Sequence, residues 1–187
     1  MRYGARLLLC ALAGGLIGTG AAVYSVRAGA LGNQERLGPW TTGRAIGTAA
    51  ADRYTRAVVA LRGLLALPAA EARYYNASVD SSGAPLDGRC RYRLRGGALP
   101  AAWWSVTLYD PAGYLLPNAA ELYSVGSAGL SAAEQQGWAV TIAPDRAPGH
   151  WLPTAGAPRF ELTLRTYLPQ GPVSAAELPR IEKERCA

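Results

Sequence analysis

The chain begins with an uninterrupted apolar segment. Residues Leu7 to Val26 read LLLCALAGGLIGTGAAVYSV and carry no charge, and as a helix rising ~1.5 Å per residue they cover the ~30 Å hydrocarbon layer of a bilayer. Arg2 and Arg6 precede the segment, whereas only Arg27 follows it directly. Because cytoplasmic flanks carry the excess of positive charge, the pattern predicts that residues 1–28 form a single transmembrane anchor in a bacterial inner membrane, with the rest of the chain in the periplasm.

A cleaved signal peptide is the alternative interpretation of this segment. Ala28, Gly29 and Ala30 fit the small-x-small pattern at which a signal peptidase cleaves, so cleavage after Ala30 stays open. The apolar stretch is longer than the usual h-region of ~7–15 residues, which favours a retained anchor. Under either interpretation the remaining domain is exported.

A linker and a helix are expected between the apolar segment and the first strands. Residues 29–47 are rich in glycine and show little periodicity, so we expect a linker there. The helix is expected to follow, with Thr48 as its N-cap and Pro68 after its last turn. Its apolar residues recur at helical spacing, at Tyr54, Val58, Leu61 and Leu65. An amphipathic helix beside a β domain normally covers one of the sheets, and we expect this of the helix here.

From Glu71 onward the hydrophobic pattern has a period of two, which is typical of half-buried strands. The segment from Arg89 to Arg95 alternates strictly, with arginines on one face and Cys90, Tyr92 and Leu94 on the other. The same alternation occurs later in the chain, around residues 104–108, 138–142 and 160–164. Turn sequences lie between the strands, such as those at residues 80–83, 110–113 and 147–149. This pattern predicts a mainly β domain over residues 48–187, an antiparallel β-sandwich or jelly roll with one flanking N-terminal helix.

The net charge does not indicate a nucleic-acid partner. The chain has a formal charge of +6, but three arginines flank the apolar segment and the other 16 basic residues face 13 acidic ones. Such a small excess does not favour binding to a polyanion. The densest positive feature is an arginine row, formed by Arg89, Arg91, Arg93 and Arg95. We interpret it as a solvated strand face that opposes edge-to-edge pairing; anionic lipid, lipopolysaccharide or an acidic partner is the alternative.

The cysteine count predicts one disulfide. Cys10 lies in the apolar segment, which leaves Cys90 and Cys186 as the pair in the exported domain. Two cysteines in a small domain of an oxidising compartment usually form a bridge. We therefore expect a Cys90–Cys186 disulfide that ties the C-terminal tail to a strand near the middle of the chain.

Three motifs follow one another along the second half of the chain: AWWSVTLYD from Ala102 to Asp110, WLP from Trp151 to Pro153, and LTLRTYLP from Leu162 to Pro169. In this order they resemble the domain of unknown function 1214 family. Other segments resemble its short, membrane-anchored members, at residues 52–57, 73–75 and 178–186. The resemblance extends from about Trp40 to the end, and it implies a β-rich domain that occurs alone or joined to a second uncharacterised domain. It implies no established reaction and no catalytic residues.

The sequence offers no catalytic motif. The single histidine, His150, has Asp145 five positions earlier, but no G-x-S-x-G or S-x-x-K motif supplies a nucleophile. One histidine and two cysteines expected to be bridged leave no metal-ligand set, and there is no phosphate-binding glycine loop, so we expect neither a metal nor a cofactor. The alternative is a hydrolase or lyase of envelope carbohydrate, which requires four residues to meet in one pocket: Tyr109, Asp110, His150 and Arg165.

Aromatic residues supply the ligand hypothesis. The candidate ligand-binding residues are Trp103, Tyr109, Asp110, Trp151, Arg165 and Tyr167. The rings of Trp103, Tyr109 and Tyr167 alternate away from the predicted core faces. Aromatic faces beside a guanidinium suit sugars, and we expect a cleft lined by Tyr109, Trp151 and Arg165. If both sheet faces are covered, the same rings are core instead. We predict a non-enzymatic module that binds a glycan, or that assembles with an envelope protein or a second copy of itself.

Overall fold

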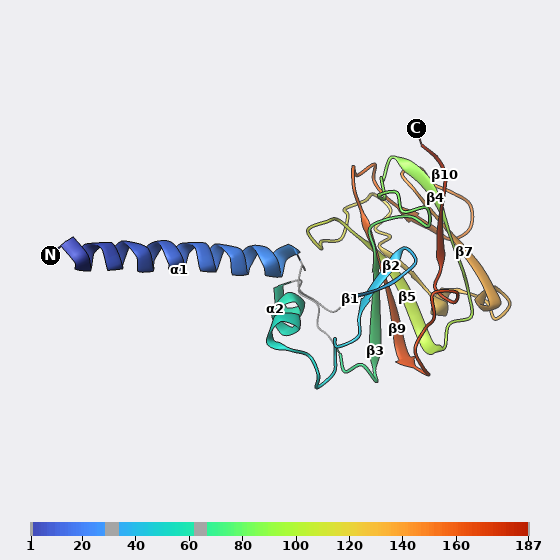
Figure 1. The fold of residues 1–187 in the computed structure, drawn as a ribbon. Coiled ribbons are helices and arrows are strands. Elements are labelled where there is room, and N and C mark those ends of the chain that lie inside the picture. The colour runs from blue at the N-terminus through green and yellow to red at the C-terminus, as the bar shows by residue number, and fades with distance from the viewer. Residues whose placement is uncertain (1, 29–33, 62–66, 187) are drawn as a thin grey trace.

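The computed structural model describes residues 2–28, 34–61 and 67–186. Its first element, α1 (Arg2–Ala28), is a helix that extends away from the rest of the molecule (Figure 1). Residues Tyr3–Val26 of α1 are long and apolar enough to cross a membrane, and none of the most apolar stretch is buried within the protein. By length and composition, α1 therefore suits either a membrane anchor or a signal sequence.

Two β-sheets form the domain that follows. The first has six strands in the order β1 (Gln34–Leu37), β2 (Trp40–Gly43), β3 (Ala72–Ala77), β9 (Glu161–Pro169), β5 (Ala101–Tyr109) and β6 (Ser124–Gly126). The second has four strands in the order β10 (Arg180–Cys186), β4 (Cys90–Gly97), β7 (Gly137–Ala143) and β8 (Trp151–Pro153). All neighbouring strands are antiparallel except β7 and β8, which are parallel. The prediction of a mainly β fold is confirmed.

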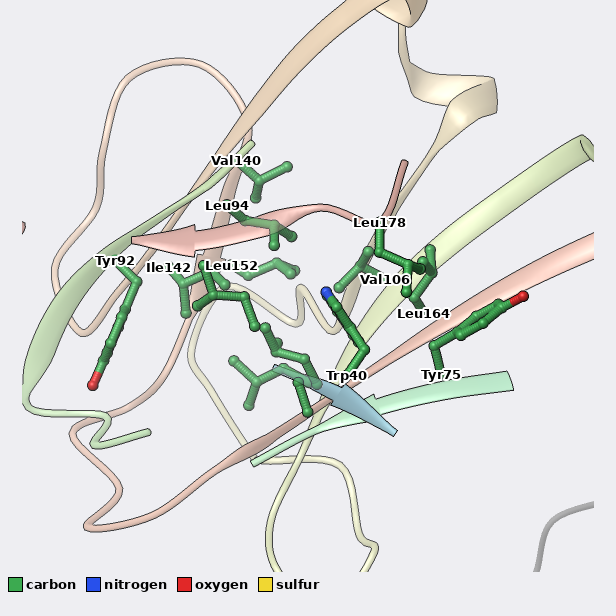
Figure 2. Packing of buried hydrophobic residues seen from close by; sticks show 14 of the residues in the cluster. Trp40, Tyr75, Tyr92, Leu94, Val106, Val140, Ile142, Leu152, Leu164 and Leu178 are labelled. Carbon is green, nitrogen blue, oxygen red and sulfur yellow. The ribbon is translucent and has the colours of Figure 1, made fainter. Parts of the chain in front are cut away.

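The core lies between the two sheets. In β4 the alternation predicted from the sequence is observed, because Cys90, Tyr92 and Leu94 are buried whereas the arginines between them are more exposed. The six-stranded sheet contributes side chains such as Val106 and Leu164 to the same cluster. Figure 2 shows the labelled side chains of the two sheets facing one another across this layer. The interior is therefore filled by side chains that a two-residue period identifies.

The prediction of a linker over residues 29–47 is wrong for residues 34–43, which form the hairpin of β1 and β2. Residues 29–33 lie outside the described residues. Gly38 turns the hairpin with a φ of +64°, so it serves as a turn residue. Trp40 is fully buried, and its indole N–H donates to the Pro179 carbonyl at 2.7 Å. Figure 2 shows Trp40 among the core side chains. Each strand of the hairpin has only four residues, too few for a period to be recognised.

The helix α2 (Arg53–Leu61) begins later than expected. Its cap is Asp52, whose Oδ1 accepts a 2.7 Å hydrogen bond from the backbone N–H of Thr55, while Thr48 donates its hydroxyl to the Ala45 carbonyl in the preceding turn. The expectation that Thr48 caps the helix is therefore wrong. Tyr54 is half-buried and lies outside the core cluster, and α2 lies beside α1 (Figure 1). Leu65, which was expected in the last turn of the helix as one of its apolar residues, lies outside the described residues.

The predicted disulfide is confirmed. Cys90 and Cys186 are bonded and stand opposite each other at the start of β4 and the end of β10. The bridge spans a sequence separation of 96 residues, and it fastens an edge strand that carries the C-terminus (Figure 1). Cys10 on α1 is free and exposed. A disulfide is typical of an oxidising compartment.

Candidate functional site

The outward surface of the six-stranded sheet, called the outer face below, carries most of the candidate residues. Alternate residues of β5 and β9 enter the core, such as Val106 and its partner Leu164. The residues between them stand opposite one another on the outer face, in the pairs Trp103 with Tyr167, Ser105 with Arg165, Thr107 with Thr163, and Tyr109 with Glu161. The outer face is therefore lined by aromatic rings, hydroxyls, one guanidinium and one carboxylate on two central strands.

Trp103 and Tyr167 form an aromatic pair across the two strands. Their ring centroids are 4.6 Å apart with the planes inclined by 44°, and Trp103 keeps 38% of its surface exposed. The Trp103 ring lies close to Gly126 on the neighbouring strand β6, which has no side chain there. A Cβ at position 126 would lie 3.4 Å from Trp103 and 2.8 Å from the Trp104 carbonyl oxygen. An exposed aromatic surface is thus held in place from both sides.

The Trp103 indole N–H also differs from those of three other tryptophans. The N–H groups of Trp40, Trp138 and Trp151 each donate to a backbone carbonyl, at 2.7, 2.9 and 3.1 Å. Within the part of the chain that the structure describes, Trp103 makes no such bond. The exposed part of the Trp103 side chain is the candidate contact for a ligand.

Arg165 is held by two hydroxyl groups next to the aromatic pair. Its Nη1 donates to Thr107 Oγ1 at 3.1 Å, and its Nη2 donates to the Tyr109 hydroxyl at 2.7 Å. The guanidinium carbon lies 5.4 Å from the centroid of the Tyr109 ring, within the range of a cation–π contact. Next to this group, the Thr163 hydroxyl donates to Asn76 Oδ1 at 2.8 Å. Four of the six predicted residues, Trp103, Tyr109, Arg165 and Tyr167, therefore share the outer face.

Asp110 has a structural position in the turn that follows β5. Its Oδ1 accepts hydrogen bonds from the backbone N–H groups of Ala112 at 2.9 Å and Tyr114 at 2.8 Å. Carboxylates commonly stabilise turns in this way. The arrangement gives Asp110 a role in shaping the loop after β5.

Trp151 lies on the other side of the sandwich from Arg165. It stands opposite Thr141 on the outward surface of the four-stranded sheet, while the next residue, Leu152, enters the core. The expected cleft lined by Tyr109, Trp151 and Arg165 is therefore not formed, because the packed core separates these residues. The alternation along β8 could have placed Trp151 on a surface, but nothing local in the sequence tells which sheet β8 joins.

His150 is also remote from the outer face. His150 lies just before β8, and its carbonyl accepts a 2.8 Å hydrogen bond from the N–H of Thr141 on β7. Its Nε2 lies 3.2 Å from Glu134 Oε1. Hydrogen bonds from the Ser131 hydroxyl and backbone N–H, together with His150, hold the pKa of Glu134 at about 2. The four residues of the hydrolase or lyase alternative thus do not meet in one pocket. Among the described residues there is no cluster of three or more histidine, cysteine or acidic side chains suited to a metal ion.

The arginine row lies on the outward surface of the four-stranded sheet, where β10 supplies carboxylates. Glu184 Oε2 is 2.8 Å from Arg91 Nε and its Oε1 is 3.7 Å from Arg93 Nε, and Glu182 lies 3.3 Å from Arg95. Arg89 pairs with Asp87. The sequence does not reveal the ion pairs with Glu182 and Glu184, because only the register of β10 against β4 brings these acidic residues near the arginines.

Solved protein structures are similar to this chain. A protein from Vibrio parahaemolyticus called VPA0106 is 25% identical and superposes with a TM-score of 0.58, over 72% of this chain and 36% of that one. A putative uncharacterized protein from Burkholderia cenocepacia is 19% identical with a TM-score of 0.47, over 61% of this chain and 30% of that one. The chain thus spans about a third of the length of each. No curated protein is significantly similar to it.

A family profile also matches the chain. The matched family carries the description "Protein of unknown function (DUF1214)", and the match covers residues 71–171. This region runs from the start of β3 to just beyond β9, so it includes both central strands of the outer face. The match agrees with the resemblance carried by the motifs around Trp103, Trp151 and Arg165. The chain belongs to the DUF1214 family.

Proposed function

We propose that this protein is a non-enzymatic saccharide-binding module that α1 holds at the periplasmic side of a bacterial inner membrane. The observation that carries the proposal is the Trp103–Tyr167 pair beside Arg165 on the outer face, in which Trp103 is exposed and Tyr167 is half-buried. Sugar rings present apolar C–H surfaces and polar edges at once. A binding surface for them needs aromatic faces together with donors and acceptors, and the outer face supplies both.

The dimensions of the outer face support an extended ligand. Trp103 and Tyr109 are six residues apart on β5, which at ~3.4 Å per residue corresponds to about 20 Å. Between them, Ser105 and Thr107 lie on the same side of the strand but are only 7% exposed, so the accessible contacts are the partly exposed side chains of Trp103, Tyr109 and Arg165. Side chains held on a rigid sheet require little ordering when a ligand binds.

Saccharide binding is tested with the full chain in neutral detergent, first on a glycan array that includes envelope polysaccharides and then by calorimetry on the hits. Trp103→Ala should weaken binding by about thirtyfold, since a central aromatic contact contributes ~2 kcal/mol. Trp151→Ala is the matched control and should bind like the wild type, because Trp151 lies on the other sheet. Equal affinity of both variants, or a flat array, would refute the proposal.

The proposed location rests on α1 and the disulfide. A positively flanked apolar helix is exported with its following domain outside, and a disulfide persists in oxidising surroundings. Alkaline phosphatase fused to the C-terminus should be active, because this enzyme folds only outside the cytoplasm. A mass measurement of the membrane-extracted protein then separates a retained α1 from cleavage after Ala30. An inactive fusion with normal expression would contradict the location.

Assembly with another protein is a second candidate function, and the loop between β5 and β6 favours it. Tyr114 is 72% exposed and Leu115 is 43% exposed, although Asp110 and Asn118 hold the loop in shape through hydrogen bonds. Apolar side chains presented on an ordered loop are typical of contact surfaces. The double variant Tyr114→Ser/Leu115→Ser should abolish any self-association or partner cross-linking of the full chain, while leaving saccharide binding unchanged. A persistent complex would exclude this loop as the interface.

A further inference from the structure

Arg165 differs from several arginines of the domain that lie in ion pairs. Arg44, Arg91 and Arg95 each lie within 3.3 Å of a carboxylate oxygen. Arg165 is half-buried, yet none of the ion pairs between described residues includes it, and its recorded hydrogen bonds go to the neutral hydroxyls of Thr107 and Tyr109. A positive charge at this depth is partly removed from water, and the two groups that accept its hydrogen bonds are neutral.

The two hydrogen bonds orient the guanidinium but use only some of its N–H donors. A guanidinium has five N–H donors in one plane, and Thr107 and Tyr109 take two of them. The contact with the Tyr109 ring adds a third constraint on its orientation. A guanidinium held in this orientation is preorganised for the two oxygens of a carboxylate, which it binds in a bidentate manner.

The spacing to the aromatic pair matches neighbouring sugar units. Arg165 and Tyr167 are two residues apart on β9 and point to the same side, so their positions on the strand are about 7 Å apart. One ring of a saccharide can therefore stack on Trp103 while a substituent of the adjoining ring reaches Arg165. Asn76, which is half-buried on the neighbouring strand β3, adds an amide on the same side of the sheet.

The charges near the outer face favour a single carboxylate over a phosphate. Phosphate groups are usually bound by several cations or by a helix N-terminus. Arg165 is the one arginine among the paired positions of β5 and β9 on this face, and the only lysine of the chain, Lys183, lies on β10 of the other sheet. We infer, on the basis of the proposed saccharide site, that the ligand is an acidic saccharide whose uronic-acid carboxylate pairs with Arg165.

The test compares acidic oligosaccharides with their methyl esters, which keep the same backbone but lose the charge. Short oligomers of galacturonate, glucuronate and mannuronate, each in both forms, are titrated into the full chain in neutral detergent. We expect at least one acid to bind at least tenfold more tightly than its ester. Arg165→Gln should abolish this difference, and Arg165→Lys should restore only part of it because the planar fork is lost.

Two controls separate the inference from the proposed function. Arg95→Gln removes a positive charge from the opposite sheet, so it should leave the preference for the acid unchanged. Trp103→Ala should weaken binding of the acid and of any ester that binds by a similar factor, since stacking does not depend on the charge. Near-ultraviolet circular dichroism of each variant verifies that the fold is retained.

Three results would overturn the inference. If the esters bind as well as the acids, or if only neutral glycans bind, the saccharide site stands and the role of Arg165 is wrong. If the acids bind but Arg165→Gln keeps the preference, the attraction comes from the net charge of the protein. If no saccharide in the array or the panel binds, the proposed function and the inference both fail.

Discussion

The Cys90–Cys186 disulfide should supply a large part of the stability of the domain. It closes a loop with a sequence separation of 96 residues, and for a loop of about 100 residues the chain-entropy model gives ~4.7 kcal/mol. Replacing Cys186 with alanine removes no core atoms, because Cys186 is exposed while Cys90 is buried. We expect Cys186→Ala to lower the free energy of unfolding by about 3–5 kcal/mol, or the melting temperature by roughly 10–15 °C.

The measurement is urea unfolding of the full chain in detergent, followed by the fluorescence of the buried tryptophans. Reductant should lower the stability of the wild type to that of Cys186→Ala and should leave the variant unchanged. Cys10→Ala is the matched control, since this cysteine is free on α1. A loss below ~1 kcal/mol for Cys186→Ala would refute the reasoning, because it would mean that the bridge restrains only the end of β10.

Further predictions concern the core, the acid stability and the binding face. Trp40→Phe should lower the free energy of unfolding by about 2–4 kcal/mol, because it removes buried ring volume and the hydrogen bond to Pro179; a urea titration measures it, and a change below ~1 kcal/mol would contradict the role of Trp40. The pKa of Glu134 is about 2 in the fold against an ordinary 4.5, so its contribution to stability is fully present above pH 4.5 and is lost as the pH falls towards 2. The urea midpoints of wild type and Glu134→Gln should therefore converge between pH 5 and pH 2, and a constant difference would contradict this. Gly126→Ala should weaken saccharide binding, since the added Cβ crowds the Trp103 ring and the Trp104 carbonyl; calorimetry on the best array ligand tests it, and unchanged affinity would show that the ring is not held by this contact.

The candidate site shows which of its features follow from the local sequence pattern and which depend on contacts between distant strands. The alternation of β5 and β9 placed Trp103, Tyr109, Arg165 and Tyr167 away from the core, and the structure finds all four on the outer face. Trp151 was grouped with them although it belongs to the other sheet. A two-residue period tells which side of its own strand a residue occupies, but it carries no information on which strands are neighbours.

The sequence by itself determined the features that repeat over many residues or depend on a count. The apolar run of α1, the long alternating strands such as β4, and the pairing of the two remaining cysteines are of this kind. Only the tertiary structure decided the hairpin of β1 and β2, the ion pairs between β10 and the arginine row, and the hydrogen bonds that orient Arg165. These depend on contacts between residues far apart in the chain, whose energies come from packing and register and leave no trace in the local pattern.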